Sequence, residues 1–167
     1  MRRSLTTLLA TLLLATLAVA QNPPKRRGPA AATPGPDRQL MQSIWEAWST
    51  LNPEAASKFY DKGATHVFFD ITPLKYTGWA DYQRGVRDVL AQFQSFKATV
   101  NPDAQIHRHG DLAWGAATWH GDIVNKDGSK SSMDGRWTVL WRRKGNDWLI
   151  VHEHVSVPLS QEAPKKQ

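Results

Sequence analysis

Apolar side chains recur at helical spacing in three stretches of the chain. The first stretch begins after Asp37, a residue type that often caps helices, and its apolar positions are Leu40, Ile44, Trp48 and Leu51. Asn52-Pro53 predicts the start of a second helix that runs to about Tyr60. A third helix is predicted from Trp79 to about Phe96, with a stripe formed by Tyr82, Val86, Val89, Leu90, Phe93 and Phe96.

Strand spacing dominates the rest of the chain. A short strand is expected at 65–70, followed by a turn and a short return strand at 74–77. After the third helix the period becomes two, and the predicted strands are 98–108, 112–124, 131–142 and 147–157. This order predicts an α+β domain in which three N-terminal helices pack on a curved, mainly antiparallel sheet. Such a roll would enclose a cone-shaped cavity.

Alternation along the last strands separates two faces of the predicted sheet. The odd positions of 112–124 and 131–142 are mainly apolar and include Trp119 and Trp137. In the last strand, one set holds Leu149, Val151, Glu153 and Val155, and the other holds Trp148, Ile150, His152, His154 and Ser156. If the apolar sets share the inner face, Glu153 is the single acid on that face of the last two strands. The outer face then carries Arg136, His152 and His154, which predicts a homodimer contact; the alternative is that the two faces are exchanged.

An inward carboxylate at Glu153 would have lost solvent, so its pKa should rise unless it is paired. Such a group can act as an acid, a base or an acceptor for a ligand. The competing interpretation is a structural glutamate that is hydrogen-bonded to the backbone or bridged to an arginine.

The ends of the chain change how its charge is interpreted. Residues 1–20 are typical of a secretory signal peptide, with Arg2 and Arg3, a short apolar run and an Ala18-Val19-Ala20 cleavage site. Residues 21–37 form a Pro/Ala/Gly-rich basic linker and residues 161–167 a similar tail, which leaves a domain at 38–160. Most of the net charge of +6 lies at these ends, because residues 40–164 carry 13 basic and 14 acidic side chains. We therefore expect a secreted protein, in the bacterial periplasm, that neither spans a membrane nor binds nucleic acid.

The closing motif resembles a known family. The segment WLIVHEHVSVP at 148–158, preceded by GRWT at 135–138, resembles the final hairpin of the SnoaL-like, ketosteroid-isomerase-like branch of the nuclear-transport-factor-2-like superfamily. Phe69-Asp70, Pro73 and Tyr76-x-Gly78 match what this branch carries before its third helix. The resemblance covers roughly residues 38–159 and implies the fold more than the activity.

A second resemblance concerns the ligand. The closing motif is also similar to the association domain of calcium/calmodulin-dependent kinase II, whose pocket arginines fall on Trp119, Val139 and Val155 here. None of these positions is arginine in this chain, so capture of an anionic ligand is not implied.

Enzymes of the superfamily use a pocket acid to move a proton next to a carbonyl, while tyrosine or a protonated acid holds the oxyanion. The resemblance implies Asp70 and Glu153 as acid/base candidates, Tyr76 and Tyr82 as donors, and Trp119 and Trp137 as pocket walls. Asp70 could equally cap the turn at 71–72, and Tyr82 could equally be a core residue.

Paired histidines at 107/109 and 152/154 suggest a metal site, because alternate strand positions lie on one face. His107 and His109 are expected to bracket a turn, and no third ligand is evident beside His152 and His154 on the neighbouring strand, so we expect no metal and no cofactor. Three functions are compatible with these features. The first is binding of a small, largely apolar molecule in an aromatic pocket. The second is an isomerase, cyclase or dehydratase with Asp70 or Glu153 as general base, and the third is a non-catalytic assembly or accessory module.

Overall fold

The computed structural model describes residues 34–159, and the predicted signal peptide, most of the linker and the tail lie outside them. Its helices are α1 (Arg38–Ser49), α2 (Pro53–Ala56), the 3₁₀ turn η1 (Ser57–Phe59) and α3 (Trp79–Leu90). The predicted caps are present, since the Asp37 carboxylate accepts from Leu40 N and the Asn52 side chain accepts from Glu54 N.

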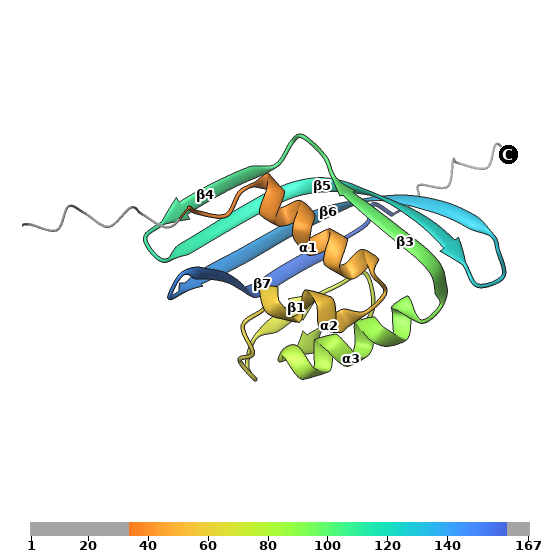
Figure 1. Cartoon of the computed structure of the whole chain (residues 1–167), viewed down its shortest axis with the longest axis horizontal. Coiled ribbons are helices and arrows are strands. Elements are labelled where there is room, and N and C mark those ends of the chain that lie inside the picture. The colour runs from red at the N-terminus through yellow and green to blue at the C-terminus, as the bar shows by residue number, and fades with distance from the viewer. Residues whose placement is uncertain (1–33, 160–167) are drawn as a thin grey trace, which may run out of the picture. The chain divides into compact units, whose positions relative to one another are not determined.

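One seven-stranded sheet forms the other layer of this described part (Figure 1). Its strands are β1 (Val67–Phe69), β2 (Tyr76–Thr77), β3 (Phe93–Val100), β4 (Gln105–His109), β5 (Leu112–Asn125), β6 (Lys130–Lys144) and β7 (Asp147–Ser156). The order is β2-β1-β7-β6-β5-β3, and β4 also pairs with β5. All pairs are antiparallel except β1 with β7. The α+β prediction is confirmed.

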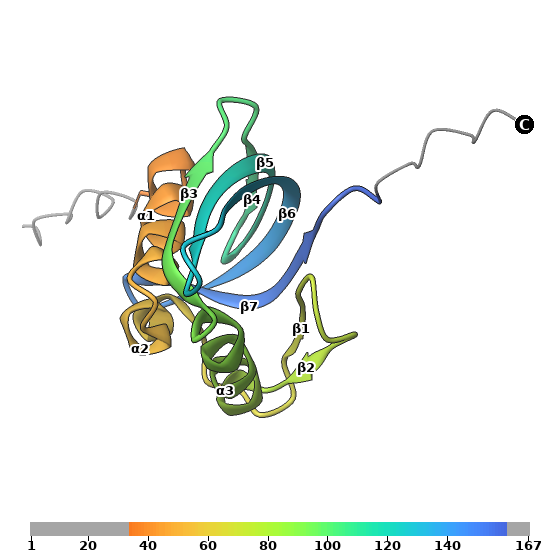
Figure 2. The ribbon, with the colours of Figure 1, turned by 90° about the vertical axis from the view of Figure 1, so that its right-hand side faces the viewer.

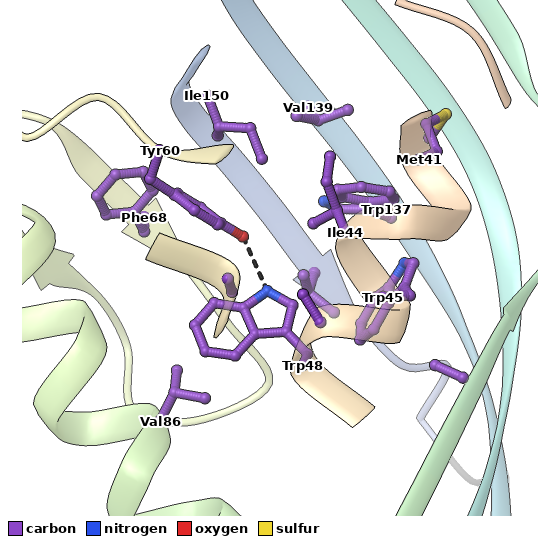
Figure 3. Packing of buried hydrophobic residues seen from close by; sticks show 14 of the residues in the cluster. Met41, Ile44, Trp45, Trp48, Tyr60, Phe68, Val86, Trp137, Val139 and Ile150 are labelled. Carbon is purple, nitrogen blue, oxygen red and sulfur yellow. Dashed lines mark hydrogen bonds between the residues drawn. The ribbon is translucent and has the colours of Figure 1, made fainter. Parts of the chain in front are cut away.

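The sheet is strongly curved, and the helices lie along its concave side (Figure 2). Helix α1 runs beside β3, and α3 lies below the end of the sheet near β1 and β2. The buried face of α1 includes Met41, Ile44, Trp45 and Trp48, which pack against β-strand side chains such as Trp137 and Val139 (Figure 3). This packing leaves the aromatic residues of helix and sheet facing one another.

The predicted assignment of the inner face is confirmed for β5 and β6. Trp119, Trp137 and Trp141 on the odd positions are at most 1% exposed, whereas Arg136 on an even position is exposed. The faces are therefore not exchanged.

In β7 the prediction was partly wrong. The register shifts between Leu140 and Trp141, because Leu140 pairs with His152 but Trp141 pairs with Ile150. The extra residue, Val151, is a β-bulge that reverses the parity of the residues before it. Ile150 and Trp148 consequently point inward and are buried, although strict alternation placed them outside.

Two element boundaries also differ from prediction. Helix α3 ends at Leu90 rather than near Phe96, because residues from Phe93 onward pair with β5 across the sheet. The predicted strand 98–108 is divided into β3 and β4 at Asn101-Pro102. Proline has no N–H to donate to a ladder, so a break at Pro102 is expected.

Candidate functional site

A cavity of about 260 Å³ lies between the helices and the inner face of the sheet. Indole rings from α1, β5 and β6 form much of its wall: Trp45, Trp48, Trp119 and Trp137. Trp45 connects two of the others, since its ring centroid lies 4.6 Å from that of Trp119 and 5.6 Å from that of Trp137. Aliphatic side chains of α3 complete the wall, so the interior is predominantly apolar.

Glu153 on β7 lines this cavity and is 2% exposed. Its Oε1 accepts hydrogen bonds from the Tyr60 hydroxyl at 2.8 Å and the Tyr82 hydroxyl at 2.6 Å, and its Oε2 accepts from Trp137 Nε1 at 2.8 Å. The Tyr60 oxygen in turn accepts from Trp48 Nε1 at 3.0 Å (Figure 3). Four buried donors from α1, the end of η1, α3 and β6 therefore form a network that converges on one carboxylate.

Burial controls the ionisation of this network. It raises the pKa of Glu153 to about 7, although the three hydrogen bonds from Tyr82, Tyr60 and Trp137 oppose the shift. Burial, followed by the charge of Glu153, also raises the pKa of both tyrosines well above their ordinary value. The tyrosines are therefore neutral donors at physiological pH, and Glu153 can exchange a proton there.

Asp70 is a second acid that lines the cavity, and it follows β1 directly. Its side chain is half-buried, and burial raises its pKa to about 6 even though Oδ1 accepts a hydrogen bond from Ile71 N at 2.7 Å. Its charge also contributes to the raised pKa of Glu153. Asp70 thus both caps its turn and lines the cavity.

A family model described as a SnoaL-like domain matches residues 38–160. The chain belongs to the SnoaL-like domain family. A comparison with curated proteins found no significant match.

Several solved structures of other proteins share the fold of this SnoaL-like domain. A nuclear transport factor 2-like superfamily protein from Salmonella enterica is 18% identical with a TM-score of 0.65, covering 78% of this chain and 96% of its own. A candidate dehydratase of the same superfamily from Streptomyces avermitilis is 16% identical with a TM-score of 0.63, covering 75% and 100%. The association domain of the C. elegans calcium/calmodulin-dependent kinase is 18% identical with a TM-score of 0.57, covering 71% and 91%. At these identities the likeness establishes the fold, and the resemblance stated from the closing motif is confirmed.

The other acid that is buried among the described residues of the SnoaL-like domain has different surroundings. Asp61 accepts from His66 Nε2 at 2.9 Å and from Gly63 N at 2.9 Å, and Arg142 lies 3.4 Å away. Burial would raise its pKa, but these hydrogen bonds hold the pKa below its usual value. Asp61 is thus a charge-paired structural residue, whereas the partners of Glu153 are all neutral.

The predicted site residues of the SnoaL-like domain divide into two groups. Tyr82, Trp119 and Trp137 line the cavity together with Glu153 and Asp70. Tyr76 is not among the lining residues; its ring lies 5.2 Å from that of Tyr82 and its hydroxyl donates to Thr72 O at 3.2 Å. It faces α3 from β2, so its position does not support the expected role as a ligand donor.

Tyr60 is the residue that sequence reasoning missed. It was assigned only to the end of a helix, yet it contacts Glu153 because it forms a parallel bridge with Ile150 on β7. The available signal in the sequence was a tyrosine immediately after a short helix. The direction of the Tyr60 hydroxyl depends on the bridge to Ile150 and could not be predicted from that signal.

Part of the predicted outer face is covered by contacts within the domain itself. Arg136 and His154 are exposed, but His152 is half-buried and its Nδ1–H donates to Val67 O at 2.7 Å. Trp114 remains 47% exposed, and the ring of His107 stacks on it with the two centroids 4.4 Å apart.

Between residues 34 and 159 no group of three metal-ligating side chains occurs, and no helix has the length and apolar character needed to cross a bilayer.

Proposed function

We propose that this SnoaL-like domain binds a small, largely apolar molecule in the cavity beside Glu153 and Asp70. The observation that carries the proposal is the combination of an apolar wall with a fully buried carboxylate that has only neutral partners. A concave apolar site with a few convergent polar groups and shifted pKa values is the usual form of a ligand pocket. A glutamate kept only for stability would be expected to have a cationic partner, as Asp61 does.

The binding proposal predicts that filling the cavity abolishes uptake of a neutral apolar probe. Val89 lines the cavity from α3 and is only partly buried, so Val89→Trp should occupy the space with little effect on folding. The fluorescence of 1-N-phenylnaphthylamine should rise with the wild-type protein and not with this variant. Leu74→Trp is the matched control, because Leu74 is 90% exposed and outside the cavity. Equal fluorescence with all three proteins would contradict the proposal.

A second candidate function is acid–base catalysis on a carbonyl compound. The observation that favours it is the presence of two carboxylates with raised pKa values in one cavity, beside the Tyr82 hydroxyl. Asp70 would take the proton next to the carbonyl, because only one of its oxygens has a hydrogen-bond partner within residues 34–159. Protonated Glu153 would then supply a donor for the developing oxyanion.

Exchange of the α-protons of cyclohexanone in D₂O, followed by NMR, tests this candidate without knowledge of the substrate. The wild-type protein should accelerate exchange, and Asp70→Asn should reduce the catalysed rate by about 100-fold or more. Asp88→Asn is the control, since Asp88 is exposed on α3 and outside the cavity. Exchange that is equally fast with Asp70→Asn would remove Asp70 from the mechanism.

The proposal also includes a location and a partner. The signal-like residues 1–20 support secretion into a periplasm. Trp114 on β5 and Arg136 on β6 are both exposed on the outer face of neighbouring strands, which supports a homodimer there. Arg136→Glu reverses a charge on this face and would break any pairing of Arg136 with an acid of the partner, so it should lower the mass measured by light scattering to that of a monomer. A wild-type protein that is already monomeric would contradict the homodimer.

A further inference from the structure

The lining of the cavity has an unusual charge composition. Among the described residues that form it, Asp70 and Glu153 are acids, and there is no lysine, arginine or histidine. Aromatic rings make up much of the remaining surface: Trp45, Trp48, Tyr82, Phe93, Phe96, Trp119 and Trp137. Two carboxylates thus share an aromatic enclosure with no protein cation to balance them.

The hydrogen bonds to Glu153 explain how a charge can be held there. Donors occupy both of its oxygens, two on Oε1 and one on Oε2, and each donor directs a proton toward the carboxylate. This arrangement suits an ionised glutamate, because ionised carboxylates accept only. It does not supply the opposite charge, since tyrosine and tryptophan remain neutral. For the ionised form of Glu153, opposite charge therefore has to come from outside the described wall.

Three classes of ligand would meet this wall differently. An organic anion would be repelled by both carboxylates, and a neutral apolar molecule would remove water from them without compensation. An organic cation would offset the desolvation, and its charge would also be attracted by the faces of indole and phenol rings. The chemistry of the wall matches the third class.

We propose that the natural ligand is an organic cation, a quaternary or protonated amine that carries an apolar group. This inference rests on the proposed binding of a small molecule in the same cavity and names its chemical class. The apolar group contacts the aliphatic side chains of α3, and the cationic head lies between the carboxylates and the indole rings.

The titratable groups around the site give the pH dependence of binding. Glu153 is faced by Tyr60 on the η1 side, Tyr82 on α3 and Asp70 after β1, and Asp70 is additionally near Tyr76 on β2. The tyrosines stay neutral, so the two acids alone change charge between pH 5 and pH 8, with pKa values of about 6 and about 7. A cation prefers the ionised forms, and its affinity therefore rises as the pH increases through this range.

A matched series of ligands tests the class. Phenyltrimethylammonium and tert-butylbenzene have nearly the same shape and differ in charge, and benzenesulfonate supplies the anion. Titrations followed by intrinsic tryptophan fluorescence at pH 8 should show the cation binding at least about tenfold more tightly than tert-butylbenzene, and benzenesulfonate most weakly. Between pH 8 and pH 5 the affinity for phenyltrimethylammonium should decrease by about tenfold or more, while that for tert-butylbenzene should not. The quaternary ammonium does not titrate, so any change belongs to the protein.

Variants test whether the preference for a cation depends on the carboxylates. Asp70→Asn should weaken binding of phenyltrimethylammonium and leave tert-butylbenzene unaffected, and it is preferred to Glu153→Gln because Asp70 is only half-buried. Asp88→Asn should change neither affinity. If tert-butylbenzene binds as tightly as the cation at pH 8, or if Asp70→Asn leaves the cation unaffected, the inference is overturned and the binding proposal stands. If none of the three ligands binds, the binding proposal is contradicted and the inference falls with it.

Discussion

The contribution of Glu153 to the free energy of unfolding is expected to fall by on the order of 3 kcal/mol as the pH rises from about 4.5 to about 7. In the unfolded chain the carboxyl has an ordinary pKa near 4.5, and burial raises the pKa in the folded protein to about 7. The folded state therefore binds more protons between these values, and stability decreases as the pH increases through them. Below this window the favourable contribution is complete, and above it no further loss from Glu153 occurs.

Urea denaturation of the wild-type protein and Glu153→Gln across this pH range measures the effect. Glutamine does not titrate, so the pH dependence due to Glu153 should appear as a slope in the difference in unfolding free energy between the two proteins. The amide nitrogen of glutamine would oppose the Trp137 N–H, which adds a roughly constant cost of about 1–3 kcal/mol at every pH. Asp88→Asn should keep the wild-type slope. Parallel curves for wild type and Glu153→Gln would show that Glu153 titrates normally.

The same titration connects stability to the proposed ligand. A bound cation favours ionised Glu153, so saturating phenyltrimethylammonium should reduce the loss of stability between pH 4.5 and pH 7. A neutral ligand would not reduce this loss, because it does not favour the ionised carboxylate. Stability and binding thus report the ionisation of one buried carboxylate by independent routes.

Local signals in the sequence were sufficient for much of the fold. The caps at Asp37 and Asn52 depend on side chains within three residues of the helix start, and both form as predicted. The inner face of β5 and β6 follows from alternation because these strands pair without interruption. Glu153 was placed on the inner face by the same rule, and it lies there because Glu153, like Val155, comes after the bulge.

The features that could not be predicted depend on contacts between distant residues. The bulge at Val151 inverts the preceding half of β7, and no local composition marks it. Phe93 and Phe96 continue the helical stripe of α3, yet pairing with β5 outweighs helix periodicity there. The contact between Tyr60 and Glu153 has the same origin, since a bridge to Ile150 turns the Tyr60 hydroxyl toward Glu153.

Introducing a side chain at Gly135 is expected to lower the free energy of unfolding by about 3 kcal/mol. Gly135 lies on the inner face of β6, and a Cβ atom there would overlap the indole of Trp119 at Nε1 and Cε2. Trp119 is 1% exposed and packs against Trp45 and Phe96, so its ring cannot move aside without displacing the cavity wall. Urea denaturation of Gly135→Ala followed by circular dichroism measures the loss.

A double-mutant cycle separates this clash from a general intolerance of the strand. The three atoms that a Cβ at Gly135 would meet all belong to the Trp119 indole, so Trp119→Ala, which removes the ring, should relieve the contact. The double variant should be more stable than the sum of the two single losses predicts, by about 1–3 kcal/mol. Gly35→Ala is the control, because its Cβ would meet the Arg108 side chain at 3.4 Å and should change stability by less than about 0.5 kcal/mol. If the losses in unfolding free energy at positions 119 and 135 are additive, glycine is required at 135 by the backbone. The position of the Trp119 indole would then not depend on Gly135.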